Sequence, residues 1–534
     1  MKTTVQVHHR RRILCVFPRY APSLATFHHA YGLMDGVRAL MPPQGILVVA
    51  AYLPEEWEVR LVDENVEQVR DEGIAWADAV FVSGMHIQRT EISRLAKRAR
   101  ALLKTTVLGG PAVSASPEDY PEFDYLHLGE IGDATDALIR AIEEDCTPPP
   151  AQRRFVTKQR LPLVDFPIPA YQLVDGRRYF CGSVQYSSGC PYRCEFCDIP
   201  ELYGRQPRLK TPNQVIAELD VLIAVGFNTA IYFVDDNFIG NKKAARELLP
   251  HLVAWQKRNG YPVQLTCEAT LNIAKSPDIL ALMREAYFWM IFCGIETPEL
   301  DALQAIQKSQ NRMVPILGAI STLNQYGLEV VSGIILGLDS DTPSTVKRLT
   351  DFIDGSRIPV LTINLLQALP KTPLWDRLYA AGRITEQDGL QSNVIFIRPY
   401  EEIVQSWKDC MRHAYEPDAI YRRFAWQIEH TYCHRITPPL SQSRLSPASL
   451  RRALVITAKV LMRVGLLADY RRSFWRLAWL ALRAGRIDAL IHAGLVAHHM
   501  ITFSRDCARD RENASLFAKR PRLSAKPVLP TAKA

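Results

Sequence analysis

The stretch Ser188-Gly189-Cys190-Pro191-Tyr192-Arg193-Cys194-Glu195-Phe196-Cys197 places three cysteines at C-x3-C-x2-C spacing. Thiolates are the usual ligands of iron–sulfur clusters, so three of them can hold three irons of a four-iron cluster. The fourth iron then lacks a protein ligand and can bind a small molecule through an amine and a carboxylate. The stretch therefore predicts a [4Fe-4S] cluster with one iron open to a ligand.

A structural zinc site is the alternative interpretation of these cysteines. Such a site is tetrahedral and needs a fourth ligand, for which Cys181, Cys267 or Cys293 would be available. A redox-active pair of Cys194 and Cys197 is disfavoured, because no thioredoxin-like pattern surrounds it. The chain has 11 cysteines without other tight clusters, which favours reduced thiols and a metal cluster over disulfides.

The composition is that of a globular protein. Of the 534 residues, 48% are hydrophobic and 22% are charged, and the length allows two or three domains. No apolar segment of the signal-peptide type lies near the N-terminus, so we expect the protein to stay in the cytoplasm. Residues 441–534 contain 18 Lys and Arg against 5 Asp and Glu, while the rest of the chain is net acidic. This basic end could bind nucleic acid or anionic lipid.

Strand-like runs alternate with helical stretches across residues 1–146, which we expect to form the first domain. This alternation is typical of a Rossmann-like, doubly wound parallel sheet, whose ligands lie beyond the carboxyl ends of the strands. Five such runs occur, at 12–18, 58–63, 79–84, 106–111 and 125–130, with helices expected at 42–54 and 91–103. Small or polar residues follow three of these strands: Ser83, Gly84, Gly109, Gly110, Gly129 and Glu130.

Residues 147–175 are rich in proline and predict a linker, because proline neither continues a helix nor donates to a sheet. A second series of strands and helices covers 176–400. Its six βα units predict a partial (β/α)6 barrel, with an active site at the carboxyl ends of the strands. The strands are expected at 183–187, 230–234, 263–267, 289–293, 330–335 and 361–365. The polar residues and glycines near their ends are Asp235, Asp236, Asn237, Glu268, Glu296, Gly333 and Gly337.

Residues 401–510 are expected to form an α-helical extension, and 511–534 a disordered basic tail. Arginines interrupt the apolar pattern of 450–503, so no run of 18 apolar residues could span a bilayer. The stretch 472–484 combines two tryptophans and several leucines with arginines, which is typical of a helix lying on a membrane surface. A helical subdomain packed on the barrel is the alternative.

The cysteine spacing, with Phe196 before the third cysteine, resembles the signature of the radical SAM superfamily. Members of this superfamily cleave S-adenosylmethionine at the open iron to form a 5′-deoxyadenosyl radical. The resemblance implies that Cys190, Cys194 and Cys197 hold the catalytic [4Fe-4S] cluster. It also implies that S-adenosylmethionine is bound by Phe196, Asp235, Asp236, Asn237, Glu268, Glu296, Gly333 and Gly337.

Residues 1–146 resemble the cobalamin-binding domain that precedes many radical SAM barrels. A D-x-H-x-x-G motif, which would offer a histidine to cobalt, is absent, and we interpret His86 as a satisfied or exposed histidine instead. A Rossmann-like domain without cobalamin is the alternative, because glycines after strands also form ordinary turns. The resemblance implies a cobalamin site at Ser83, Gly84, Gly109, Gly110, Gly129 and Glu130.

Over nearly the whole chain, and in the runs 232–238 and 293–297, the sequence is similar to hopanoid carbon-2 methylases. These are radical SAM methyltransferases that depend on cobalamin. The resemblance implies that one electron enters the cluster, that the adenosyl radical removes a hydrogen from an unactivated ring carbon, and that methylcobalamin supplies the methyl group. The implied partners are a hydrophobic polycyclic lipid, a reductant such as flavodoxin or ferredoxin, and a membrane surface contacted by 450–503.

Other functions use the same modules. A tetrapyrrole enzyme, either a bacteriochlorophyll side-chain methylase or an oxidative cyclase, is the alternative within this class. The basic end would suit an RNA-modifying enzyme such as a tRNA methylthiolating one. However, no RNA-binding module follows the barrel, and the apolar content of 450–503 favours lipid over nucleic acid. A non-catalytic cobalamin sensor would not need the three cysteines.

Overall fold

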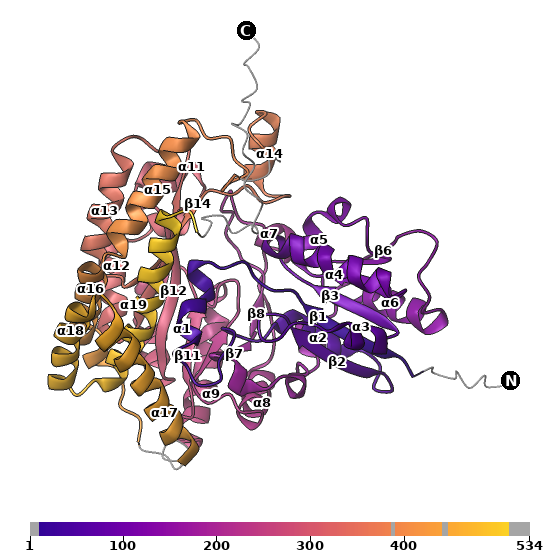
Figure 1. Cartoon of the computed structure of the whole chain (residues 1–534), viewed down its shortest axis with the longest axis horizontal. Helices are drawn as coiled ribbons and strands as arrows, with labels where there is room; N and C mark the ends of the chain where they lie inside the picture. The colour runs from indigo at the N-terminus through magenta and orange to yellow at the C-terminus, as the bar shows by residue number, and fades with distance from the viewer. Residues whose placement is uncertain (1–9, 386–389, 440–446, 512–534) are drawn as a thin grey trace, which may run out of the picture.

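The chain folds into two parallel β-sheets and a C-terminal group of helices. A computed structural model describes residues 10–385, 390–439 and 447–511. The first sheet and its helices lie on the right of Figure 1, and the second sheet lies on the left, covered by the C-terminal helices. The predicted basic tail lies outside the described residues, apart from Arg511.

The first sheet has the strand order β2-β1-β3-β4-β5-β6. Apolar residues of β1 alternate between two separate hydrophobic cores, Leu14 and Val16 in one and Ile13 and Cys15 in the other, so helices cover both faces. This confirms the doubly wound fold. The strands are β1 (Arg12–Phe17), β2 (Glu58–Asp63), β3 (Ala79–Ser83), β4 (Thr105–Gly109), β5 (Tyr125–Leu128) and β6 (Arg153–Val156), and the main helices are α2 (Gln44–Tyr52), α3 (Asp71–Trp76), α4 (Arg89–Ala101), α5 (Pro111–Ala115) and α6 (Asp133–Glu144).

Strand β6 corrects the predicted start of the linker at residue 147. It pairs in parallel with β5, so the first sheet continues beyond the prolines at 148–150. The strand is short, lies at the sheet edge, and has three exposed side chains out of four. It therefore lacks the buried apolar run by which a central strand of a parallel sheet is recognised.

The second sheet has six parallel strands in the order β14-β13-β12-β11-β10-β7, with β7 and β14 as its edges. This confirms the predicted partial barrel. The strands are β7 (Cys181–Val184), β10 (Ala230–Phe233), β11 (Gln264–Glu268), β12 (Phe288–Glu296), β13 (Glu329–Leu336) and β14 (Val360–Leu365). The connecting helices include α8 (Pro212–Ala224), α9 (Lys242–Arg258), α10 (Pro277–Glu285), α11 (Leu300–Ala305), α12 (Ile316–Gln325) and α13 (Thr345–Ser356).

The C-terminal helices pack on the β14 side of the barrel. Trp407 donates its indole N–H to the backbone oxygen of Ile363 in β14, at 2.8 Å. The last helix contacts α1 (His28–Tyr31), so segments from the two ends of the chain lie side by side. Within the described ranges, no helix is both long enough and apolar enough to cross a bilayer. The C-terminal helices are α14 (Pro373–Ala380), α15 (Tyr400–Ala414), α16 (Pro417–His430), α17 (Pro447–Val460), the π-helix η10 (Leu461–Leu467), α18 (Arg471–Arg483) and α19 (Ile487–Ala508).

Asp63 joins the two halves of the molecule and gives a pH-dependent prediction. It ends β2, accepts a hydrogen bond from the Tyr179 hydroxyl at 3.2 Å, and is 4% exposed. Burial raises the pKa of Asp63 from 3.8 to about 6. The folded state thus holds a proton that the unfolded state releases, and this contribution to stability is lost as the pH rises towards 6.

We expect the free energy of unfolding of the wild type to fall by about 1 kcal/mol more between pH 5 and pH 7 than that of Asp63→Asn. Denaturant unfolding at the two pH values measures this difference. Equal pH dependence in the two proteins would contradict the buried, protonated carboxyl.

Candidate active site

The cysteine stretch begins at the last residue of the short strand β8 (Ser187–Ser188), which pairs with β9 (Arg208–Leu209) beyond the carboxyl end of β7. Cys194 is buried, and Cys190 and Cys197 are half-buried. Burial raises the pKa values of Cys190 and Cys197, and smaller increases come from the neighbouring thiols and, for Cys197, from the charge of Asp198. Three thiols with mutual electrostatic influence suit a cluster in which each binds a different iron.

The zinc alternative finds no support in the geometry. Cys181, Cys267 and Cys293 are 3%, 0% and 0% exposed inside barrel strands. Among the described residues, no group of three His, Cys, Asp or Glu side chains converges on a point where one metal ion could bind. A four-iron cluster does not require such convergence, because each cysteine binds a different iron of the cluster.

Two side chains after α11 face the cysteines and were missed by sequence reasoning. Gln310 donates a hydrogen bond from Nε2 to the Cys194 sulfur at 3.1 Å. Lys308 forms a buried ion pair with Glu296, with Nζ 2.6 Å from Oε1, and its Nζ lies 5.4 Å from the centre of the Phe196 ring. Hydrogen bonds and charges near the sulfurs tune such clusters. Gln310 lies 116 positions after Cys194 in the sequence, and no local pattern marks such distant residues as neighbours of the cysteines.

Glu195 fixes the middle of the cysteine stretch to a distant helix. Arg377 of α14 binds its carboxylate in a two-pronged pair, at 2.5 Å and 3.1 Å. The backbone of Glu195 accepts from the Leu374 N–H at 2.9 Å and donates to Ile306 at 3.0 Å. Two carboxylates hold Arg377, since it also contacts Asp339 at 2.7 Å.

We expect Arg377→Met to lower the iron content, because it leaves the nearly buried Glu195 carboxylate without its counter-charge. Removing one partner of a fully buried ion pair lowers the free energy of unfolding by about 3–5 kcal/mol. We expect about half of that loss here, because the Arg377 side chain is 46% exposed. Iron per chain and denaturant unfolding measure the effect. The exposed arginine Arg258 provides the control variant Arg258→Met, and an iron content equal to that control would argue against the role of Arg377.

The residues after β10 bind the backbone segment that precedes the cysteines. Asp235 accepts from the N–H groups of Tyr186 and Ser187 at 3.1 Å and 2.5 Å, and Asp236 accepts from the Gly189 N–H at 2.6 Å. Burial raises the pKa of Asp235 to about 6 and that of Asp236 to about 7. Both carboxyl groups therefore position the backbone that leads to Cys190.

The other barrel residues of the predicted site lie on three neighbouring strands. Glu268 ends β11, accepts from the Tyr232 hydroxyl at 3.2 Å, and has its pKa raised to about 7 by burial. Glu296 ends β12 with a left-handed φ of 65°, and a Cβ added at Gly333 of β13 would lie 3.5 Å from its Oε2. Gly337 differs: at φ 92°, an added Cβ would lie 2.4 Å from the Phe396 ring, so packing explains the glycine.

The predicted cobalamin residues lie together at the carboxyl ends of strands β3, β4 and β5 of the first sheet. Gly110, at φ 95°, approaches both Ser83 and Gly84, since an added Cβ would lie 2.8 Å from the Ser83 hydroxyl. Gly129, at φ 101°, donates its N–H to the Ser114 hydroxyl at 2.9 Å. Gly109, which ends β4, lies beside this group.

Glu130 connects the carboxyl end of the first sheet to the cysteine stretch. Its carboxylate accepts from Arg208 at 2.6 Å, from Arg160 at 3.2 Å and from the Ser188 hydroxyl at 3.2 Å. Arg208 lies in β9, and Ser188 is two residues before Cys190. The carboxyl ends of the two sheets therefore meet, as a reaction between two cofactors requires.

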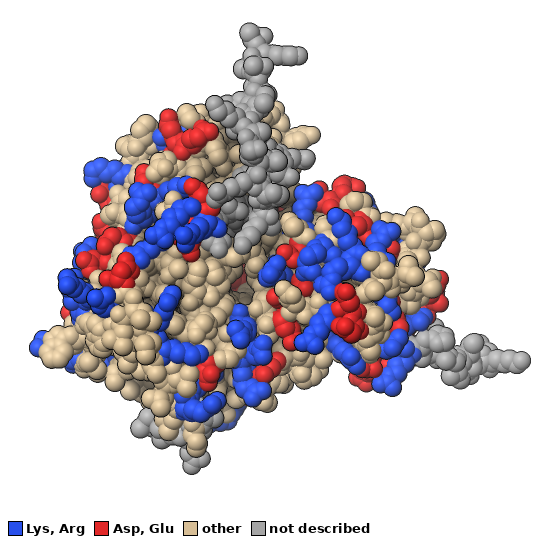
Figure 2. All heavy atoms as spheres, viewed as in Figure 1, with Lys and Arg blue, Asp and Glu red and all other residues tan. Residues whose placement is uncertain are grey.

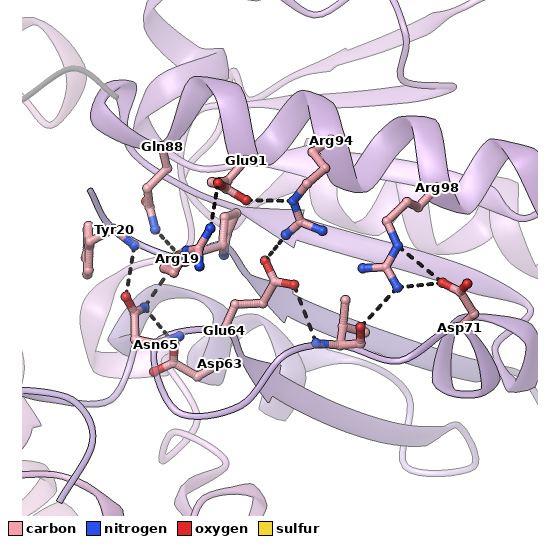
Figure 3. A network of polar contacts seen from close by, with 12 residues as sticks. Arg19, Tyr20, Asp63, Glu64, Asn65, Asp71, Gln88, Glu91, Arg94 and Arg98 are labelled. Atoms are coloured by element: carbon pink, nitrogen blue, oxygen red, sulfur yellow. Dashed lines mark hydrogen bonds and ion pairs between the residues drawn. The ribbon is translucent and has the colours of Figure 1, made fainter. Parts of the chain in front are cut away.

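A polar network fixes the loops beyond β1 and β2 (Figure 3). Asn65 accepts from the Tyr20 N–H at 2.9 Å and donates to Asp63 at 2.7 Å, while Gln88 donates to the backbone oxygen of Pro18. Further ion pairs along α4 join Arg94 to Glu64 and Glu91, and Arg98 to Asp71. His86, just after β3, has a buried Nε2 without a partner among the described residues, and burial lowers its pKa to about 4.

The residues present suit the implied cofactors. Inside the barrel mouth, Nδ2 of Asn237 and Oγ1 of Thr266 are buried without hydrogen-bond partners in the described part of the chain. Between the sheets, Nε and Nη1 of Arg208 are likewise buried and unpaired. Buried donors without partners are costly, so their presence here favours polar ligands such as the carboxylate and ribose of S-adenosylmethionine and the amides of cobalamin.

Comparison with known families matches three successive parts of the chain. Residues 32–139 match the B12 binding domain, and 184–353 match the radical SAM superfamily. Residues 372–513 match a domain of unknown function, DUF4070. The predicted modules and their cofactors, cobalamin and S-adenosylmethionine with a [4Fe-4S] cluster, are thereby confirmed.

Individual proteins resemble the chain over most of its length. It is 56% identical to the hopanoid C-2 methylase of Rhodopseudomonas palustris (strain TIE-1), over 97% of this chain and 98% of the relative. It is 21% identical to the bacteriochlorophyllide d C-12(1)-methyltransferase of Chlorobaculum tepidum, over 72% and 85% of the two chains.

A solved structure shows the same fold. The radical S-adenosylmethionine methyltransferase TsrM from Kitasatospora setae, with cobalamin and a [4Fe-4S] cluster bound, superposes with a TM-score of 0.57 at 16% identity, over 91% of this chain and 99% of that one. Fold, modules and the 56% identical relative agree. The chain therefore belongs to the family of hopanoid C-2 methylase, among the cobalamin-dependent radical SAM methylases.

Proposed function

We propose that the protein methylates carbon 2 of a hopanoid lipid. The observation that carries this proposal is the 56% identity to a hopanoid C-2 methylase across 97% of the chain. The proposed carbon is an unactivated ring position without an acidic proton, so acid–base chemistry could not functionalise it. When bound, the cluster, S-adenosylmethionine and cobalamin supply the radical and methyl-transfer chemistry that this carbon requires.

The residues of the chain hold and orient these groups. Cys190, Cys194 and Cys197 hold the cluster, and Asp235 with Asp236 fix the backbone that leads to it. Glu268, Glu296 and the unpaired amide of Asn237 offer hydrogen bonds to S-adenosylmethionine. The glycines beyond β3, β4 and β5 let the backbone approach cobalamin closely. Glu130 keeps the cobalamin side of the site next to the cluster side.

Lipid mass spectrometry tests the proposed reaction. The gene is expressed in a hopanoid-making bacterium that lacks its own C-2 methylase, and Cys194→Ala serves as the matched inactive variant. We expect hopanoids heavier by one methyl group only with the intact protein, and fragmentation places the methyl on the ring that contains carbon 2. Unchanged hopanoids from protein loaded with cluster and cobalamin would overturn the substrate assignment.

A tetrapyrrole substrate is the second candidate, because the chain also resembles the bacteriochlorophyllide d C-12(1)-methyltransferase of Chlorobaculum tepidum over 72% of its length. The lower identity to that enzyme, 21% against 56%, favours the hopanoid. Altered pigment masses with unchanged hopanoids would favour the tetrapyrrole.

We also propose that the protein is cytoplasmic and binds the inner membrane peripherally through residues 450–503. Nine of the 19 large hydrophobic side chains that are exposed in the described residues lie within 450–487. On α18, Trp475, Trp479 and Leu482 form one stripe, 47%, 60% and 53% exposed. Residues 447–487 contain nine Lys and Arg but one acidic residue.

The charged and apolar groups of this surface lie next to each other. The Arg483 guanidinium stacks 4.6 Å from the centre of the Trp479 ring, and the Trp475 indole donates to Gly465 of η10 at 2.8 Å. Figure 2 shows Lys and Arg at the left edge, where α18 lies in Figure 1, beside a broad uncharged surface. Aromatic and leucine side chains beside arginines favour an anionic bilayer.

We expect Trp475→Ser with Trp479→Ser to weaken binding to vesicles that contain anionic phospholipid by about tenfold or more, since each lost indole removes about 1.5–3 kcal/mol of burial. Vesicle flotation measures the binding. Leu103→Ser with Tyr379→Ser, at side chains that are 84% and 69% exposed elsewhere, is the control. Equal loss in the control pair, or none in the tryptophan pair, would contradict the membrane face.

A further inference from the structure

A basic pocket lies on the outer side of the cysteine stretch. Three exposed arginines line it, Arg193, Arg205 and Arg312, together with the uncharged polar side chains of Gln304, Gln307 and Ser309. Of the described residues, no Asp or Glu lines this pocket. None of the three guanidinium groups forms an ion pair within the described ranges, in contrast to the paired arginines Arg208 and Arg377.

The wall of this pocket is also the wall of the cluster site. Along residues 307–310, Gln307 and Ser309 are exposed and line the pocket, whereas Lys308 and Gln310 are buried and face the cysteines. Gln310 contacts the Cys194 sulfur at 3.1 Å. Arg193 is the chain neighbour of Cys194. A single layer of polypeptide therefore separates the pocket from a cluster ligand.

The two sides of this layer suit different partners. S-adenosylmethionine and the lipid react inside the barrel mouth, where Glu268, Glu296 and Gly333 lie. Electrons must arrive from outside, and transfer slows steeply with distance, so the donor has to reach the surface nearest a cluster ligand. Unpaired surface cations accelerate the encounter with an acidic partner, and complexes of electron-transfer proteins are small and weak.

We propose that this pocket and its three arginines are the docking site of an acidic one-electron carrier protein of the flavodoxin class. The inference rests on the proposed function, because it assumes a radical SAM cluster that needs reduction. In the transfer, the carrier loses one electron and the cluster gains one, with no bond made or broken. The arginines bind the carboxylates of the carrier and place its redox centre against the outer side of residues 307–312.

The test compares a protein reductant with a chemical one. The holoenzyme carries Arg193→Glu, Arg205→Glu and Arg312→Glu together, and the electron donor is either reduced recombinant flavodoxin or titanium(III) citrate. We expect cleavage of S-adenosylmethionine driven by flavodoxin to fall at least tenfold, while the rate with titanium(III) citrate stays within twofold of the wild type. The dissociation constant for flavodoxin, measured by calorimetry, should rise at least tenfold, and the wild-type value should depend strongly on salt.

A matched control uses three other exposed arginines without ion-pair partners in the described ranges, as Arg258→Glu, Arg284→Glu and Arg422→Glu. This variant has the same net charge, and we expect both its rates and its affinity to match the wild type. Equal losses in the two triple variants would reduce the effect to net charge and overturn the docking site. So would an unchanged flavodoxin rate in the pocket variant, or a parallel loss with titanium(III) citrate. The assay needs no lipid, so a wrong substrate assignment would leave its result intact.

Discussion

Replacing Cys194 with alanine is expected to abolish both the cluster and methylation. Cys194 is the buried member of the three cysteines, and Gln310 and Lys308 are arranged around it. With two thiolates left, two irons would lack protein ligands, and the cluster would be lost during isolation. Iron and sulfide content, the electron paramagnetic resonance signal of the reduced protein, and lipid analysis measure the three consequences.

Two other cysteines provide controls for this variant. Cys433→Ala removes an exposed thiol, and Cys267→Ala removes a thiol inside β11 that the zinc alternative would use. We expect both to retain iron, although Cys267→Ala leaves a small cavity and is less stable. Methylation by Cys194→Ala would refute the radical mechanism, and one zinc per chain that is lost in Cys267→Ala would favour the zinc site.

Replacing Lys308 with methionine is expected to destabilise the protein by about 3–5 kcal/mol, because it leaves the Glu296 carboxylate buried without a counter-charge. The two side chains are 8% and 11% exposed, and their charged atoms are 2.6 Å apart. Desolvation lowers the pKa of Lys308, but the charge of Glu296, its hydrogen bond with Lys308 and the nearby sulfurs of Cys194 and Cys197 together outweigh desolvation, so the net shift is upward and the amine stays protonated. The midpoint of denaturant unfolding, measured with the cluster present, gives the loss.

The chain offers both a rescue and a control for this ion pair. Lys308→Met with Glu296→Gln removes both charges, and we expect it to regain much of the lost stability. Lys347 and Asp351 form an ion pair with 77% and 64% exposed side chains. For Lys347→Met we expect a loss below about 1 kcal/mol. Similar losses for Lys308→Met and Lys347→Met would show that the buried pair has no special weight.

Much of the fold was predictable from the sequence, because its signals are local. The six barrel strands were placed within about three residues of their observed bounds, since each is a short apolar run between helical stretches. Strand β6 was missed because two of its four residues are arginines and it lies at the edge of the sheet. The sequence also predicted that the cobalamin residues lie close together, because the loops after neighbouring parallel strands meet at the carboxyl end of the sheet.

The candidate site was predictable only in its ligands. Cysteine spacing specifies cluster chemistry wherever the segment folds, so Cys190, Cys194 and Cys197 could be named without a structure. The sequence could not give a reason for each glycine: Gly110 allows a close approach of two loops, whereas Gly337 makes room for Phe396. Glycine looks the same in both cases, and only the neighbours of the missing Cβ distinguish them.

The sequence by itself determined the modules, their order, the cofactors and the family of this protein, because these depend on residue spacing and on patterns within single elements. Only the tertiary structure decided what surrounds the cysteines. Arg377 reaches Glu195 across 182 positions and Gln310 reaches Cys194 across 116. It also placed three arginines, which form no ion pair with any described residue, on the outer side of the same wall. Such contacts arise when separate elements pack together, and neither helical nor strand periodicity carries information about which distant side chains will meet.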